Sequence, residues 1–315
     1  MKRILAVVAL LLLVAPAAHA KTLKVALLLP GSISDASYNA GAYQGIKQAE
    51  QKHDIRVSIT ESLPNAAIEE TMLNYARDGF DVIIGHGFQF GEPALKLHKQ
   101  FPDTWFCING FYKGEAPNMM AVQNRYYELG FVFGTLSALV SKTGVLSNVT
   151  AISVPLIEEF NAGFREGAEK AKPGTKVLGG IVGSWSDVAK GKEITASHIE
   201  QGADIVTGLG NESVVGHYQA AKEAGVWALG MSFDAHGIAP DTIFTTALIK
   251  IENNIELMIR EIVNGTVEPK MYSLGFKEDG LGIAPYRNFE DKIPADVKQR
   301  VADLIDEFKQ NPPTQ

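Results

Sequence analysis

The regular alternation of short apolar runs with helix-like segments is the feature that most constrains how this chain can fold. From Lys24 onward, the strand-like runs KVALLLP, RVSITES, DVIIGHG and TWFCING are separated by segments with helical periodicity. Strands that are joined by crossover helices run parallel, and the helices then cover the sheet. The first part of the chain is therefore predicted to form a parallel sheet with helices on both faces.

A second series of the same kind follows a long helical segment, YYELGFVFGTLSALVSK, that begins after Arg125. Its strand candidates are VLSNVTAI, KVLGGIV, DIVTGLG and WALGMS, with helical segments between them. A further strand, TIFTTAL, and the helix KIENNIELMIREIVNG precede a polar tail. The chain is thus predicted to be α/β and to form two similar halves, each near the usual size of a domain.

The first twenty residues have the pattern of a secretory signal peptide. Lys2 and Arg3 precede the apolar run ILAVVALLLLVAPA, and Ala18-His19-Ala20 has the small residues of a cleavage site. The apolar run is short for a membrane span, so a retained anchor is the weaker interpretation. No cysteine follows the expected cleavage point. We therefore expect a mature protein that is free in the periplasm and carries no lipid anchor.

Charge, cysteine content and motifs exclude several classes of function. The chain has 29 basic and 36 acidic residues, so loss of Lys2 and Arg3 changes the formal charge from −7 to −9. This charge argues against nucleic acid and anionic membranes as partners. Cys107 is the only cysteine, which rules out a disulfide framework. GLGNES lacks the third glycine of a dinucleotide loop, and no hydrolase or phosphate-loop motif occurs. We expect no enzyme activity, no cofactor and no metal.

Chemically distinctive side chains follow the predicted strands, at the positions where doubly wound sheets bind ligands. Tyr38 and Trp185 can sandwich a flat ring, and stacking is worth about 0.5–1.5 kcal/mol per aromatic pair. Carboxylates and carboxamides can bond the edge of such a ring and penalise the wrong ligand. The candidate ligand-binding residues are Asp35, Tyr38, Asn39, Phe88, Asn109, Trp185, Asn211 and Asp234. Together they predict a site for an uncharged, partly aromatic molecule.

Each of these residues also has an ordinary structural interpretation. Asp35 is expected to cap a helix, and Asp187 is expected to cap the helix that contains AKGKEIT. Tyr38, Phe88 and Trp185 would be unremarkable as packing residues. From the residues alone, the choice between packing and binding stays open.

Five segments of the sequence resemble the basic membrane protein family of ABC-transporter substrate-binding proteins, the purine-nucleoside-receptor type. They follow the order of the family across nearly the whole mature chain. They are SDASYNAGAYQGI, FNAGFREGAEKAKPGTKV, GSWSDVAKGKE, IEQGADIV and YQAAKEAGVWALG. The resemblance implies two Rossmann-like lobes joined by three hinge crossings, near Arg125, near Thr246 and within residues 275–282. It assigns residues 21–124 plus 247–277 to an N-lobe, and residues 125–246 plus 278–315 to a C-lobe.

The resemblance also implies roles for individual residues. Tyr38 stands where the family has a stacking phenylalanine, with Asn39 beside it on the base, and Trp185 is the opposing aromatic. Asn109 replaces an aspartate that contacts the base edge. At the sugar end, Asp234 matches a family aspartate, Ser232 replaces another, and Ile249 stands at the position of a ribose-contacting lysine. Lys250 is one residue later on the strand, where the side chain points the other way.

The function implied by the resemblance is that of a periplasmic binding protein, expected to be a monomer, that delivers a purine nucleoside or similar flat heterocycle to a membrane ABC permease with its ATPase. Hinge closure would bury the ligand between Tyr38 and Trp185. The alternatives are a free purine base, a flavin or a sugar as ligand, or a sensor for a membrane receptor. An exported nucleoside hydrolase would need an acid cluster or a bound metal at the cleft.

Overall fold

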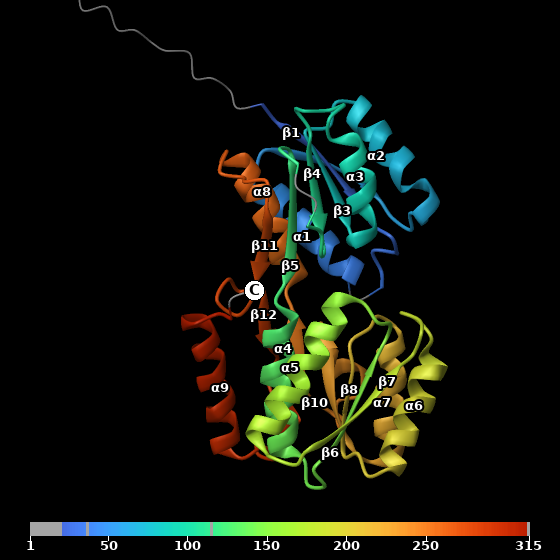
Figure 1. Ribbon diagram of the computed structural model, residues 1–315, viewed down its shortest axis with the longest axis vertical. Coiled ribbons are helices and arrows are strands. Elements are labelled where there is room, and N and C mark those ends of the chain that lie inside the picture. Colours follow the sequence, from blue (N-terminus) through green and yellow to red (C-terminus); the bar gives the residue numbers. More distant parts are fainter. Residues whose placement is uncertain (1–20, 36–37, 114–115, 314–315) are drawn as a thin grey trace, which may run out of the picture.

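Two six-stranded sheets form the centres of two lobes that lie end to end (Figure 1). The computed structural model describes residues 21–35, 38–113 and 116–313. The expected signal peptide, residues 1–20, lies outside these described residues. Helices flank both sheets, so the α/β fold with two parallel-sheet lobes that the sequence predicts is confirmed.

The N-lobe sheet has the strand order β11-β5-β4-β3-β1-β2, and all its described pairings are parallel. Its strands are β1 (Leu23–Leu28), β2 (Ile55–Thr60), β3 (Val82–His86), β4 (Trp105–Asn109), β5 (Met119–Asn124) and β11 (Met271–Leu274). Its helices are α1 (Tyr38–Lys52), α2 (Ile68–Arg77), α3 (Gly91–Leu97) and α8 (Ile251–Val263), with the short 3-10 turns η1 (Asn65–Ala67) and η2 (Phe88–Phe90).

The C-lobe sheet has the order β12-β10-β9-β8-β6-β7. Its strands are β6 (Val145–Thr150), β7 (Lys176–Ile181), β8 (Ile205–Thr207), β9 (Trp227–Ser232), β10 (Ile243–Ile249) and β12 (Leu281–Ile283). Its helices are α4 (Tyr126–Val140), α5 (Pro155–Ala171), α6 (Val188–Glu200), α7 (Ser213–Ala224) and α9 (Ala295–Gln310), with the 3-10 turns η3 (Ala235–Ile238) and η4 (Arg287–Phe289). The pairing of β12 with β10 is antiparallel, unlike the others described in this sheet.

The chain passes between the two sheets at three places. β5 leads through Arg125 into α4, β10 leads through Lys250 into α8, and β11 is joined to β12 by residues 275–280. The second passage follows Ile249, three residues beyond Thr246, because the last three residues of β10 pair with β12 in the C-lobe sheet. Strands β5, β11 and β12 had no counterpart among the strands assigned from the sequence.

Glycines bring several helices into close backbone contact. A Cβ atom added at Gly134 of α4 would lie 2.1 Å from the carbonyl oxygen of Phe164 in α5, so only glycine fits there. In the N-lobe, a Cβ atom at Gly45 of α1 would lie 2.8 Å from the Cα atom of Glu252 in α8. This second contact holds the start of α8 against α1, whose first residue is Tyr38. The packing of α1 on α8 thereby positions one wall of the site described below.

No helix within the described residues is both long enough and apolar enough to cross a membrane. Cys107 is a buried free thiol in the middle of the N-lobe sheet.

Candidate ligand-binding cleft

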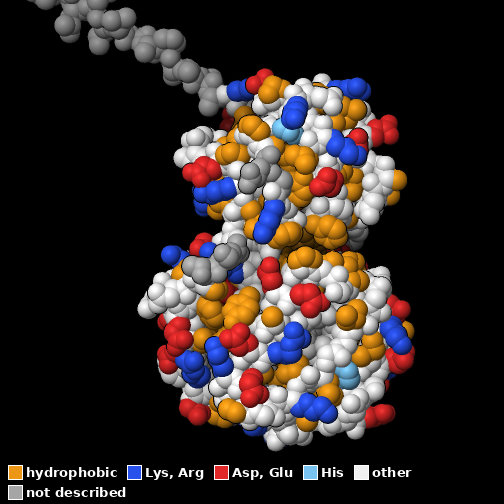
Figure 2. Space-filling view, in the orientation of Figure 1, with side chains coloured by type: hydrophobic (Ala, Val, Ile, Leu, Met, Phe, Trp, Pro, Cys, Tyr) orange, Lys and Arg blue, Asp and Glu red, His pale blue; other side chains and the backbone are white. Residues whose placement is uncertain are grey.

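A cleft of about 890 Å³ lies between the two lobes and draws its lining from both. Figure 2 shows the waist between the lobes, with hydrophobic side chains on either side of it. The volume is within the range usual for small-molecule sites. All eight candidate residues line this cleft, namely Asp35, Tyr38, Asn39, Phe88, Asn109, Trp185, Asn211 and Asp234.

Tyr38 is held firmly on the N-lobe side of the cleft. Its ring stacks on the imidazole of His86, with the ring centroids 3.7 Å apart and the planes inclined by 24°. Its hydroxyl donates a hydrogen bond to the backbone carbonyl of Asn109 over 3.0 Å. Burial raises the pKa of the Tyr38 hydroxyl, so this group stays a donor at any physiological pH. The ring therefore has one face covered by His86 and a fixed orientation.

His86 is fully buried behind Tyr38, and its burial favours the neutral form of the imidazole. One ring nitrogen, Nε2, lies 2.9 Å from the backbone carbonyl oxygen of Tyr38, and the other, Nδ1, lies 2.8 Å from Asn109 Nδ2. A carbonyl oxygen only accepts hydrogen bonds, so Nε2 carries the proton and Nδ1 is the acceptor. Burial lowers the pKa of His86 to about 3. The neutral tautomer that the contacts require is thus the stable one.

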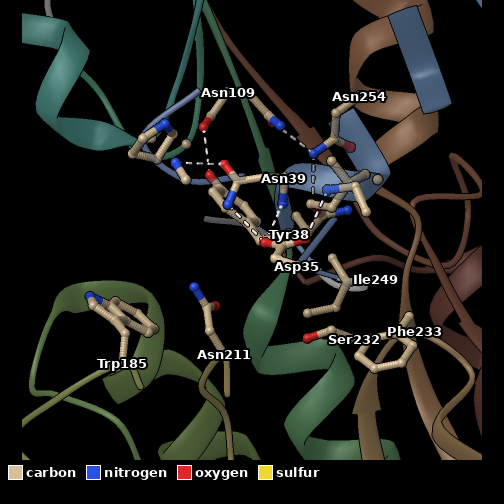
Figure 3. Close-up of a pocket in the computed structure, with 18 of the residues that line it drawn as sticks. Asp35, Tyr38, Asn39, Asn109, Trp185, Asn211, Ser232, Phe233, Ile249 and Asn254 are labelled. Atoms are coloured by element: carbon tan, nitrogen blue, oxygen red, sulfur yellow. Dashed lines mark hydrogen bonds between the residues drawn. The ribbon is translucent and has the colours of Figure 1, made fainter. Parts of the chain in front are cut away.

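A chain of buried carboxamides continues from His86 to the passages between the lobes, and Figure 3 shows its bond between Asn109 and Asn254. Asn254 Nδ2 donates to Asn109 Oδ1 over 3.0 Å and to Asn124 Oδ1 over 2.8 Å. Asn124 Nδ2 in turn donates to the backbone carbonyl of Gly280 over 2.8 Å. Asn109 is among the residues predicted from the sequence, whereas Asn254 and Asn124 are not. Asn254 lies in the first turn of the helix after β10, so inspection of the segment that follows this strand would have found it.

Asp35 caps helix α1, as the sequence predicts. Its carboxylate accepts hydrogen bonds from the backbone N–H groups of Asn39 and Ala40, each over 2.9 Å. It also accepts from Asn39 Nδ2 over 2.7 Å, while Asn39 Oδ1 accepts from the backbone N–H of Gly31 over 3.3 Å. Both ends of the Asn39 carboxamide are therefore engaged within the loop that precedes α1.

The C-lobe side of the cleft carries side chains with fewer bonds. Trp185, Asn211, Ser232 and Phe233 face the N-lobe residues in Figure 3. The side chains of Trp185, Asn211 and Ser232 make no hydrogen bond with the part of the chain that the structure describes. Ser232 has φ of 74°, in the left-handed region that non-glycine residues seldom adopt. Phe233 was not selected from the sequence.

Asp187 caps helix α6, two residues after Trp185, as the sequence predicts. Its carboxylate accepts a hydrogen bond from the backbone N–H of Lys190 over 2.9 Å. This cap fixes the end of the loop that carries Trp185. Phe88, on the opposite lobe, is 49% exposed and lines the cleft, so it is not a core residue.

Asp234 is bonded by Arg287, which is not among the residues predicted from the sequence. The Arg287 guanidinium donates to both carboxylate oxygens, over 2.8 Å to Oδ1 and through a second bond to Oδ2. The backbone N–H of His236 also donates to Asp234 Oδ1, over 3.3 Å. Hydrogen bonding to Arg287 holds the pKa of Asp234 below its usual value. The acceptor capacity of this carboxylate is largely used within the protein.

The charge of the cleft is predominantly acidic. Lys250 is the only lysine or arginine among the described residues of the lining, and its ammonium pairs with Asp279. Ile249, beside it, is 8% exposed and also lines the cleft. The acidic residues of the lining are Asp35, Glu212, Asp234 and Glu252. Such a surface disfavours an anionic ligand. The described residues contain no cluster of three or more potential metal ligands.

Comparison with known proteins places the chain in a family. Residues 22–310 match the family described as PnrA-like ABC transporter substrate-binding proteins. A purine-binding protein from Brucella abortus is 29% identical over 281 residues, which cover 88% of this chain and 79% of that protein. Basic membrane protein A from Borreliella afzelii is 26% identical over 289 residues, which cover 89% of this chain and 87% of that protein.

A solved structure of an ABC transporter solute-binding protein from Aeropyrum pernix has the same fold. It superimposes with a TM-score of 0.82 at 20% identity, and the match covers 91% of each chain. The family that the sequence segments indicate is thus confirmed. With a match over residues 22–310, the chain belongs to the family of PnrA-like ABC transporter substrate-binding proteins.

Proposed function

We propose that this protein is the periplasmic solute-binding component of an ABC importer and captures a purine nucleoside or a similar flat heterocycle between its lobes. The observation that carries the proposal is the pair of aromatic side chains on opposite walls of one cleft, Tyr38 from the N-lobe and Trp185 from the C-lobe (Figure 3). The protein acts as a monomer that hands its ligand to a membrane permease with an ATPase.

The mechanism is closure of the two lobes over the ligand. One face of the Tyr38 ring rests on His86, which leaves the other face for a flat ring. A ligand that stacks there stabilises the closed state when Trp185 reaches its second face, because only the closed state makes both contacts. The acidic lining favours an uncharged ligand. The name of the Brucella abortus relative, a purine-binding protein, agrees with a purine ring.

A free purine base is the second candidate, and the pair of Asp234 with Arg287 favours it. A ribose needs polar partners at the sugar end of the cleft. There Asp234 is occupied by Arg287, Lys250 is paired with Asp279, and Ile249 is apolar. These contacts leave the stacking of a ring between Tyr38 and Trp185 intact, and they reduce the number of hydrogen bonds that a ribose could make with the protein.

Calorimetry on protein that has been unfolded, stripped of carried ligand and refolded tests the proposal. Adenosine, inosine, adenine and guanine are titrated into the wild type and into Trp185→Ala. We expect at least one of them to bind, and Trp185→Ala to weaken it by about 10- to 100-fold, since an aromatic face contributes about 1.5–3 kcal/mol when buried. Unchanged affinity in this variant would contradict the sandwich.

Ile181→Ala is the matched control for Trp185→Ala. Ile181 is 53% exposed, precedes the tryptophan by four residues and does not line the cleft. Its loss should leave ligand affinity unchanged. Incubation of the wild type with adenosine or inosine tests the rival activity, nucleoside hydrolysis. The proposal predicts that no free base appears. Time-dependent release of base would show that the protein is a nucleoside hydrolase and not a binding protein.

A further inference from the structure

Asn254 lies where the N-lobe wall of the cleft meets the segments that join the lobes. It belongs to the first turn of α8, directly after the second passage between the sheets, and is 1% exposed. Its two N–H groups are both used, one on Asn109 and one on Asn124. Asn109 accepts a hydrogen bond from the stacking residue Tyr38 through its backbone carbonyl, and Asn124 donates one to Gly280 between β11 and β12.

The orientation of every group in this network follows from its ends. On one side, the carbonyl of Tyr38 fixes the His86 tautomer, so Asn109 must turn its nitrogen to His86 and its oxygen to Asn254. On the other side, the carbonyl of Gly280 fixes the nitrogen of Asn124, which leaves the Asn124 oxygen for Asn254. Both neighbours thus present acceptors, and Asn254 supplies the two donors between them.

The network reaches all three passages between the lobes. Asn124 is the last residue of β5 and precedes the first passage, Asn254 follows the second, and Gly280 belongs to the third. A rotation of one lobe against the other changes the backbone at these passages. Because the bonds are buried, where hydrogen bonds are strong and unpaired groups are costly, the rotation cannot simply exchange them for water.

The remaining polar atom of Asn254 has no partner. Its carboxamide oxygen is buried and accepts no hydrogen bond from the described residues. A buried acceptor without a partner destabilises the fold. The position is therefore organised around its two N–H donors and carries a local cost in stability.

We propose that Asn254 is a positioning residue that couples the Tyr38 wall of the cleft to the angle between the lobes. The residue acts through Asn109 and His86 on one side and through Asn124 and Gly280 on the other. The coupling to ligand capture rests on the proposed function, whereas the coupling between wall and lobe angle is a property of the ligand-free protein. It can therefore be measured without any ligand.

The test is the separation of two spin labels in the ligand-free protein, measured by pulsed electron paramagnetic resonance. Lys99→Cys in the N-lobe and Lys222→Cys in the C-lobe place the labels at exposed positions. The native Cys107 is buried, and burial raises the pKa of its thiol, so it does not compete for the label. In the same samples, nitrogen NMR of His86 reports the state of the wall behind Tyr38.

Asn254→Ala is compared with Asn253→Ala, its neighbour in the same turn. Asn253 bonds Asp279 at the surface of the hinge, over 3.1 Å to the carboxylate and 2.7 Å to the backbone oxygen, and has no bond to the network. We expect Asn254→Ala to broaden the distribution of label separations and to shift the His86 Nδ1 resonance. Asn253→Ala should leave the His86 resonance unchanged and broaden the distribution less.

The proposal is overturned if Asn254→Ala leaves the label separations as in the wild type, or changes them no more than Asn253→Ala does. If Asn254→Ala does not fold, Asn254→Ser takes its place, because it retains a single donor. We expect it to broaden the label separations and to shift the His86 resonance by smaller amounts. No change in either readout would again overturn the proposal. Failure of adenosine and adenine to bind the wild type would count against the proposed function alone, because neither readout uses a ligand.

Discussion

The two walls of the cleft differ in how many bonds their side chains already make. On the N-lobe wall, Tyr38 rests on His86 and bonds the backbone of Asn109, whose own side chain is bonded at both ends. On the C-lobe wall, Trp185 and Asn211 make no side-chain hydrogen bond with the described residues. One wall is organised before a ligand arrives, and we expect the side chains of Trp185 and Asn211, which lack such bonds, to adapt to the ligand.

This difference implies different roles for the two lobes in ligand binding. A fixed platform loses little conformational freedom when a ligand stacks on it, whereas each adaptable side chain costs about 0.5–1.5 kcal/mol to order. We therefore expect the ligand to dock first on Tyr38 and the C-lobe to close onto it afterwards. The adaptable wall then decides which substituents on the ring are accepted, because it forms around them.

The largest expected effect is the contrast between Asn109→Ala and Asn211→Ala. Loss of the Asn109 side chain leaves His86 Nδ1 and one Asn254 N–H buried without a partner, at about 1–3 kcal/mol each. Asn109→Ala should therefore lower the free energy of unfolding by about 2–6 kcal/mol, while Asn211→Ala should change it by less than about 0.5 kcal/mol. Urea denaturation measures both. Similar losses in the two variants would remove the distinction between the walls.

A smaller effect is expected from pH, through His86. Its pKa is about 3 in the folded protein and 6.5 in the unfolded chain, so the unfolded state binds the proton first. The contribution of neutral His86 to stability is complete well above pH 6.5 and is lost as the pH falls toward 3. Within this range, each pH unit lowers the folding equilibrium constant by about tenfold. Between pH 7.5 and pH 5 the loss amounts to roughly 30-fold.

Asn109→Asp should reduce this acid sensitivity. The new carboxylate would face His86 Nδ1 in place of an N–H donor, and a neighbouring negative charge raises the pKa of an imidazole. Groups other than His86 and the new carboxylate titrate alike in both proteins, so the difference between their urea midpoints at pH 7.5 and pH 5 reports on this pair. An equal loss of stability in variant and wild type would mean that His86 and Asn109 are not coupled.

The smallest expected effect concerns Arg287→Ala on the C-lobe side. The ion pair with Asp234 is partly exposed, with 35% and 39% of the two side chains accessible, so its loss should cost less than about 1 kcal/mol of stability. It also frees both oxygens of Asp234 at the sugar end of the cleft. Calorimetry should show that adenosine gains affinity relative to adenine. A ratio of affinities unchanged from the wild type would contradict a role of Asp234 in accepting a sugar.

The sequence predicts much of the fold because its information is local. Alternating strand and helix patterns indicate two parallel sheets, and polar or aromatic residues after the strands indicate where a ligand would lie. Parallel strands end at one edge of each sheet, and residues after the strands of both sheets line the same cleft, among them Tyr38 and Trp185. The caps at Asp35 and Asp187 were predictable for the same reason, since each bonds within its own helix turn.

What the sequence does not predict depends on pairings between distant segments. Asn124 and Gly280 are 156 residues apart, and nothing in the local pattern joins them. The short strand β12 becomes a strand only by pairing with β10. The same pairing keeps the end of β10 in the C-lobe sheet as far as Ile249, so the second passage begins after that residue. Arg287 lies in a turn near the C-terminal helix, and only the folded chain brings it to Asp234.

The structure of the protein with adenosine bound, or with adenine if adenosine does not bind, tests the difference between the walls most directly. We predict that the ring lies between Tyr38 and Trp185, that the bonds among His86, Asn109 and Asn254 are those of the ligand-free protein, and that Trp185 and Asn211 have moved to meet the ligand. A ligand that contacts only one lobe, or a complex in which Tyr38 has left His86 while the C-lobe wall is unchanged, would contradict the account.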